Sequence, residues 1–173
     1  LIQRVQTLKG VRLSDLERLI LNIPYTPGVK RLIRILKMLG YKIGIVSGGF
    51  SIVIDHIRSR FELDYSLANT LEIKNGFLTG RIMGDVIDGP MKAHLLREIS
   101  KKEKIPLEQV IAVGDGANDF EMLSEASLGI AFNANRFLKE RVAGSLSLPN
   151  LDALLYFLGI PHNELKTLDN SQF

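Results

Sequence analysis

The chain has 173 residues, 46% hydrophobic and 24% charged, with a formal net charge of +3. This composition is typical of one globular domain that is long enough to bury a core. The absence of cysteine excludes disulfides, a thiol nucleophile and a cysteine zinc site. No apolar run reaches the roughly 18 residues of a membrane span. The scattered charge favours an anionic small molecule over nucleic acid or a membrane as partner, and we expect a cytoplasmic protein.

The first 23 residues carry two helical patterns. Residues 1–8 place apolar side chains on one face. Ser14 followed by Glu17 matches a capping box, which predicts a second helix over residues 15–22. Because the chain begins inside a helical pattern, with no cap in front of it, we expect it to be a piece of something larger.

A helix, a strand and a glycine-rich turn come next. Thr26-Pro27 predicts the start of a helix that ends at Gly40. Tyr41–Val46 is apolar enough for a buried strand, and Ser47-Gly48-Gly49 closes it in front of another helical pattern. A hydroxyl and flexible backbone amides beside a helix N-terminus favour an anion site. A plain glycine turn, with Ser47 as the helix cap, explains the same residues.

A predicted hairpin separates this unit from the next helix. Asn75-Gly76, between two extended patterns, is a strong signal for a two-residue turn. Pro90 then opens a helix that has Lys92 in its first turn. A lysine at that end opposes the helix dipole, so it is either placed there for an anion or simply exposed to solvent.

The most informative stretch follows the apolar run Val110–Val113, which has the composition of a buried parallel strand. Gly114-Asp115-Gly116-Ala117-Asn118-Asp119 comes directly after it. Ligands of open α/β sheets bind at the carboxyl ends of the strands, and Mg²⁺ commonly bridges carboxylates and a substrate phosphate there. The alternative is an acidic turn in which Asn118 or Asp119 caps the next helix.

The C-terminal part continues the alternation of strands and helices. The sequence predicts a strand at Leu128–Ala131, a helix near Phe137–Ala143 and a last helix at Leu151–Leu158. Residues 161–173 are polar, and we expect a frayed tail.

Taken together, Ser47-Gly48-Gly49, Lys92 and Gly114–Asp119 resemble the motifs of the haloacid dehalogenase superfamily, and within it those of the phosphoserine phosphatases. Supporting stretches are Ile45–Phe50, Leu67–Ile73, Leu78–Gly80 and Gly129–Asn133. The resemblance implies an α/β fold with a three-layer α/β/α Rossmannoid parallel sheet and a β-hairpin insertion. It assigns residues 1–23 to the remnant of a helical cap, residues 24–160 to the core and residues 161–173 to the polar tail.

The resemblance also implies which residues bind the substrate. Ser47 and the Gly48 amide would hydrogen-bond phosphoryl oxygens, and Asn118 would contact the substrate. Lys92 would neutralise the charge of the phosphoryl group during transfer. Arg4 matches an arginine that grips the substrate's carboxylate from the helical cap, a task that suits a forked guanidinium. An exposed helix arginine is the alternative for Arg4.

The implied cofactor is Mg²⁺, bound by Asp115, while Asp119 would orient Lys92. These roles describe a Mg²⁺-dependent hydrolysis of the small phosphomonoester phosphoserine to serine and phosphate, which ends serine biosynthesis. The superfamily's first motif, Asp-x-Asp-x-Thr, does not occur in the 173 residues. That motif supplies the aspartate that becomes an aspartyl-phosphate, the general acid and base, and two Mg²⁺ ligands.

In this fold the strand with the first motif lies between Tyr41–Val46 and Val110–Val113. Its loss leaves two buried strand edges with unpaired backbone groups, which is costly. We therefore expect a fragment with little activity of its own. Either an N-terminal polypeptide carrying the nucleophile strand completes it, or the chain has repacked across the gap.

Three other functions stay open. The first is hydrolysis of another small phosphate ester, such as phosphohomoserine or phosphothreonine. The second is a non-catalytic domain that keeps the phosphate pocket for binding or regulation. The third, nucleic-acid binding through the basic helix near Lys101, has little support from the charge distribution.

Overall fold

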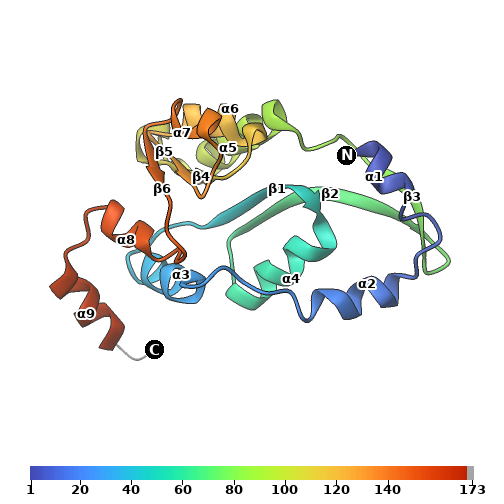
Figure 1. The fold of residues 1–173 in the computed structure, drawn as a ribbon, viewed down its shortest axis with the longest axis horizontal. Helices are drawn as coiled ribbons and strands as arrows, with labels where there is room; N and C mark the ends of the chain where they lie inside the picture. The colour runs from blue at the N-terminus through green and yellow to red at the C-terminus, as the bar shows by residue number, and fades with distance from the viewer. Residues whose placement is uncertain (171–173) are drawn as a thin grey trace.

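A computed structural model, which describes residues 1–170, has an α/β fold with two three-stranded sheets (Figure 1). The first sheet has the order β1 (Gly44–Phe50), β2 (Tyr65–Lys74), β3 (Phe77–Met83). The second has the order β4 (Ile111–Gly114), β5 (Leu128–Phe132), β6 (Gly144–Leu146). All pairs are parallel except β2 with β3, which form the predicted hairpin. The predicted α/β class is confirmed.

Helices connect and cover these strands (Figure 1). In chain order they are α1 (Ile2–Gln6), α2 (Leu13–Ile20), α3 (Val29–Met38), α4 (Ser51–Phe61), α5 (Gly89–Glu103), α6 (Phe120–Glu125), α7 (Arg136–Lys139), α8 (Ala153–Phe157) and α9 (His162–Asn170). Two short 3₁₀ turns, η1 (Leu107–Gln109) and η2 (Ala117–Asp119), flank β4. Among the residues described, no helix is long and apolar enough to cross a membrane.

Strand β5 lies between two apolar cores. Ala131 packs with Leu96 of α5 and Leu123 of α6, whereas Ile130 packs with Ile35 of α3 and residues of α8 and α9. Successive side chains of a strand point to opposite faces, so the second sheet is covered by helices on both sides. This is the three-layer α/β/α arrangement. A third, smaller core joins α1 to the hairpin.

Strands β1 and β4 each have one edge without a strand neighbour in the described part of the chain. Strand β1 hydrogen-bonds to β2, and β4 hydrogen-bonds to β5. Val113 of β4 is 38% exposed, although apolar residues of a parallel strand are ordinarily covered. The further strand that the resemblance places between β1 and β4 stays a prediction.

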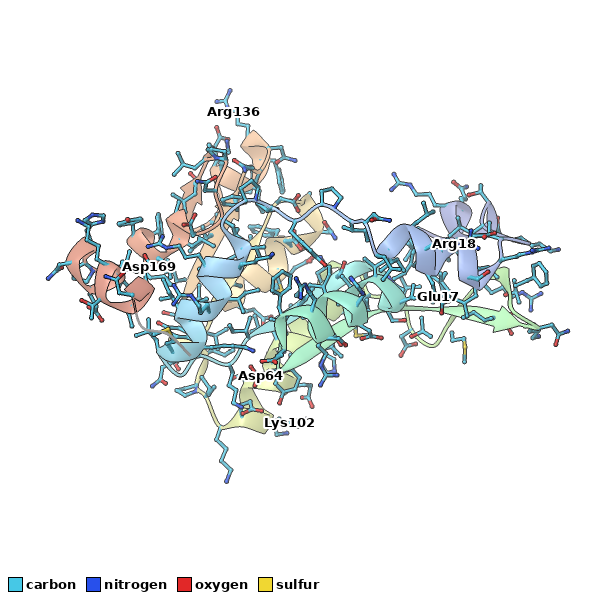
Figure 2. All side chains as sticks on the ribbon, turned by 90° about the horizontal axis from the view of Figure 1, so that it is seen from below. Glu17, Arg18, Asp64, Lys102, Arg136 and Asp169 are labelled. Carbon is cyan, nitrogen blue, oxygen red and sulfur yellow. The ribbon has the colours of Figure 1, made fainter. Side chains whose placement is uncertain are left out.

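The predicted capping box at Ser14 and Glu17 is wrong. Helix α2 begins earlier, with Arg12 as its N-cap residue and no side-chain cap hydrogen bond. The reason is tertiary: Leu13 N donates to Gly76 O at 2.9 Å, and Arg12 forms a β-bridge with Phe77. The hairpin thus fixes where the helix starts, and Glu17 is left exposed on its surface (Figure 2).

The starts of two other elements differ from the prediction. The helix expected at Thr26-Pro27 begins at Val29, after Gly28 with a φ of 83°. The strand expected at Tyr41–Val46 is β1, which starts later because pairing begins opposite Tyr65 and continues to Phe50 opposite Asn69.

The C-terminal predictions need larger corrections. The helix near Phe137–Ala143 is only the short α7, and the chain then forms β6, which pairs with β5. The segment predicted as a polar tail contains helix α9, whose Leu165 is fully buried. Residues 171–173 of that predicted tail lie outside the described residues.

Candidate active site at the ends of β1 and β4

Ser47-Gly48-Gly49 was predicted as a turn that closes the strand, but these residues lie within β1, in an irregular stretch near its end that we call the Ser47 turn. The pairing of β1 with β2 is irregular between Ser47 and Phe50. Within this irregularity the Gly49 N–H donates to Ser47 Oγ at 3.0 Å. Helix α4, which follows, has Phe50 at its N-cap and no side-chain cap hydrogen bond. Ser47 therefore does not cap the helix, and its side chain is organised within the glycine turn.

Lys92 and Asp119 form a buried ion pair. Lys92 Nζ lies 2.5 Å from Asp119 Oδ1, and the two side chains are only 6% and 7% exposed. Lys92 sits in the first turn of α5, whose N-cap Asp88 accepts a hydrogen bond from Met91 N. The alternative of a solvent-exposed lysine is excluded.

The second oxygen of Asp119 organises the loop after β4. Asp119 Oδ2 accepts from Asp115 N at 3.1 Å and from Gly116 N at 3.0 Å, so its carboxylate does not cap α6. The loop passes so close to this carboxylate that a Cβ on Gly114 would lie 2.6 Å from Asp119 Cβ. Only glycine fits there without a shift of the backbone or of Asp119.

The two strand ends meet at this point. A Cβ on Gly48 would lie 3.7 Å from Asn118 Nδ2 and 3.5 Å from Ile87 O, so the Ser47 turn within β1, the loop after β4 and the segment before α5 are in contact. Asn118 and Asp115 are exposed, and Ser47 is half-buried. A buried cationic side chain, a hydroxyl and an amide thus gather around one exposed edge.

Arg4 is a predicted site residue, but its contacts in residues 1–170 do not link it to the other predicted site residues. It is exposed on α1, which packs against β3. Within residues 1–170, no hydrogen bond or ion pair of its guanidinium to another site residue is found. Its predicted contact with a substrate carboxylate stays a prediction.

One carboxylate of the candidate site is suited to bind Mg²⁺. No group of three or more acidic or histidine side chains gathers within the described part of the chain. The Asp119 carboxylate is engaged by Lys92 and two amides, whereas the Asp115 carboxylate is exposed. Because Mg²⁺ usually takes one or two carboxylates together with substrate phosphate and water, Asp115 fits as one ligand of a site that needs further oxygen donors.

Sequence reasoning missed one polar residue next to this site. Asn69 of β2 is 1% exposed and hydrogen-bonds to the Ser47 turn near the end of β1 and to Ile87. Two sequence signals pointed to it: Asn69 lies in the stretch Leu67–Ile73 that supports the resemblance, and asparagine is uncommon within a strand pattern.

A family model described as haloacid dehalogenase-like hydrolase matches residues 4–124. The chain belongs to this family. It is 45% identical over 166 residues to a phosphoserine phosphatase of Streptomyces coelicolor, covering 96% of this chain and 40% of the relative. It is 50% identical over 159 residues to one of Archaeoglobus fulgidus, covering 92% of this chain and 46% of the relative. The chain thus spans less than half the length of these two relatives.

Solved structures agree with this haloacid dehalogenase-like fold. The chain superposes with a TM-score of 0.86 on a structure described as a phospho-aspartyl intermediate analogue of phosphoserine phosphatase, at 40% identity, covering 90% of this chain and 75% of that one. A substrate-bound phosphoserine phosphatase complex gives the same score and identity, covering 90% and 74%.

Proposed function

We propose that this chain carries the phosphate-binding part of the active site of a phosphoserine phosphatase, which hydrolyses O-phospho-L-serine to serine and phosphate. The observation that carries this proposal is the buried Lys92–Asp119 pair beside the Ser47 turn. A buried ion pair contributes little to stability compared with apolar residues of the same volume. A buried lysine at the carboxyl ends of two strands is better explained by an anionic substrate.

Each of the proposed residues would contact a different part of the substrate. Lys92 has three N–H donors and Asp119 occupies one, so the others can reach a phosphoryl oxygen. Ser47 and the Gly48 amide would donate to further oxygens, and Asn118, which lies close to Gly48, would contact the leaving group. Mg²⁺ held in part by Asp115 would add positive charge where the phosphoryl charge develops. We also propose that Arg4 binds the serine carboxylate.

The nucleophile is proposed to be an aspartate on a strand that pairs with the free edges of β1 and β4. Its carboxylate would attack phosphorus, the serine oxygen would leave with a proton from a general acid, and water would hydrolyse the aspartyl-phosphate. The open edges of both strands and the exposure of Val113 support this position. The chain without that strand is expected to be inactive. The cytoplasmic location and the role in serine biosynthesis also stay predictions.

The test is complementation. The chain is co-expressed with a polypeptide that carries the Asp-x-Asp-x-Thr strand of a relative, and phosphate release from phosphoserine with Mg²⁺ is measured. We expect turnover with wild type, and a loss of about a hundredfold or more with Lys92→Met. The control is Lys101→Met, an exposed lysine of the same helix, which should leave turnover unchanged.

The outcomes separate the open alternatives. Faster turnover of phosphothreonine than of phosphoserine would change the substrate. Phosphate binding by the complemented protein without turnover of any ester would favour the non-catalytic alternative. Full activity of Lys92→Met would refute the role given to the buried lysine.

A further inference from the structure

Among the residues described, three polar or charged side chains are buried, and Asn69 is the uncharged one. All the hydrogen bonds of the Asn69 side chain are made to backbone atoms next to the candidate site. Its Nδ2 donates to Gly48 O at 2.9 Å and to Gly49 O at 3.2 Å. Its Oδ1 accepts from Ile87 N at 2.8 Å. A single amide side chain therefore joins two segments that are far apart in sequence.

The first consequence concerns the orientation of the Ser47 turn near the end of β1. In a trans peptide the C=O and N–H point in opposite directions, so a Gly48 carbonyl held by Asn69 turns the Gly49 N–H away from Asn69. That N–H donates to Ser47 Oγ at 3.0 Å. Ser47 Oγ accepts this hydrogen bond through a lone pair, so its O–H remains available to donate to an anion.

The second consequence concerns Lys92. Ile87, which donates to Asn69, immediately precedes Asp88, the N-cap of α5. Helix α5 carries Lys92 in its first turn, so the contact fixes the start of this helix against the turn that holds Ser47. The side chain of Asn69 thereby links the segment that carries Ser47 to the helix that carries Lys92.

We propose that Asn69 is a positioning residue: it sets the Ser47 turn so that the hydroxyl is a donor, and it ties this turn to the helix that carries Lys92. This inference rests on the proposed function of Ser47 and Lys92 as phosphate ligands. Asn69 itself does not touch the phosphate, and it acts through the Gly48–Gly49 peptide.

The test uses the full chain, inorganic phosphate as probe, and the NMR resonance of the Gly49 amide. The variants are Asn69→Ala and Asn69→Asp, the second of which keeps an acceptor for Ile87 and loses the donor for the two carbonyls. Leu71→Ala is the matched control, since Leu71 is buried on the same strand but packs against α1. Ser47→Ala and the double variant Asn69→Ala/Ser47→Ala complete a cycle.

We expect both Asn69 variants to shift the Gly49 amide resonance and to weaken phosphate binding by about tenfold, the effect of losing a buried hydrogen bond. Leu71→Ala should change stability without changing either readout. If Asn69 acts through Ser47, Asn69→Ala should have little further effect in the Ser47→Ala background.

The proposal is overturned if the Asn69 variants behave like Leu71→Ala. If the losses from Asn69→Ala and Ser47→Ala multiply, the control of the Ser47 hydroxyl by Asn69 is refuted. Failure of the proposed function has a different signature. Wild type would then not bind phosphate at all. Asn69→Ala would still shift the Gly49 amide resonance while Leu71→Ala would not, and this result would support the control of the turn by Asn69.

Discussion

Lys92 and Asp119 are buried together in a place where either charge alone would be strongly destabilising. The carboxylate is satisfied on both oxygens, by Lys92 on one and by the amides of Asp115 and Gly116 on the other. A carboxylate bound in this way holds the ammonium in place and also shapes the loop that presents Asp115. The pair therefore links the positions of a phosphate ligand and of a candidate metal ligand.

Replacing Lys92 by methionine should lower the free energy of unfolding by about 3 kcal/mol, because it leaves a buried carboxylate without its counter-charge. Urea unfolding of the full chain measures this change. Arg136→Met is the control: Arg136 pairs with Glu140, but its side chain is 90% exposed, so the loss should stay below about 0.5 kcal/mol. Equal losses in the two variants would mean that the Lys92 charge is not desolvated.

Local patterns placed Ser47, Lys92 and Asp115 where a strand or a helix begins or ends. The roles given to these residues came from the family resemblance and stay predictions. The sequence left the burial of Lys92 open, since the partner Asp119 is contributed by a different β-α unit. It missed Asn69 for the same reason. The partners of Asn69 are 18 to 21 residues away along the chain, and only the folded structure brings them together.

Elements were predicted well where local chemistry determines them. The Asn75-Gly76 turn has φ values of 51° and 79°, which few other residue pairs adopt, and the hairpin forms as predicted. Helix α9 was missed because its polar composition hides one buried face. Leu165 packs against α3, and Asp169 accepts hydrogen bonds from Arg31 and Arg34 of that helix (Figure 2).

The contact between α3 and α9 should depend on pH. The hydrogen bonds from Arg31 hold the pKa of the Asp169 carboxyl below its ordinary value. A group whose pKa is lower in the folded state stabilises the protein above its unfolded pKa, and this stabilisation is lost as the pH falls through the folded pKa. The contribution of Asp169 is thus complete at pH 7 and is lost progressively below about pH 4, as the pH falls toward the lowered pKa.

Thermal unfolding between pH 7 and pH 3 tests this dependence. Asp169→Asn should unfold at a lower temperature than wild type at pH 7, and the two proteins should converge as the pH falls. Asp15→Asn removes an exposed i,i+3 pair with Arg18, and its unfolding temperature should change with pH in the same way as that of wild type. A constant difference between Asp169→Asn and wild type at every pH would show that the Asp169 charge is not involved.

On the scale of the whole molecule, the two sheets are connected by side chains and not by a shared ladder of backbone hydrogen bonds. Val46 of β1 packs against the core that α5 and α6 form with β4. The carboxyl ends of β1 and β4 meet at Gly48 and Asn118, although neither strand hydrogen-bonds to the other. The candidate site therefore lies across the least continuous part of the fold, and its precision depends on cross-links such as Asn69 and the Lys92–Asp119 pair.

This discontinuity predicts the pattern of amide hydrogen exchange. Strand β5 has strand neighbours on both sides, and its Ile130 and Ala131 are fully buried, so its amides should exchange only on global unfolding. The amides of β1 and β4 that face the open edges have no strand partner and should exchange at least about tenfold faster. Adding the polypeptide with the nucleophile strand should slow these amides selectively and leave those of β5 unchanged. If the edges of β1 and β4 are already as protected as β5 in the chain alone, the site for an inserted strand does not exist, and the nucleophile must be sought elsewhere.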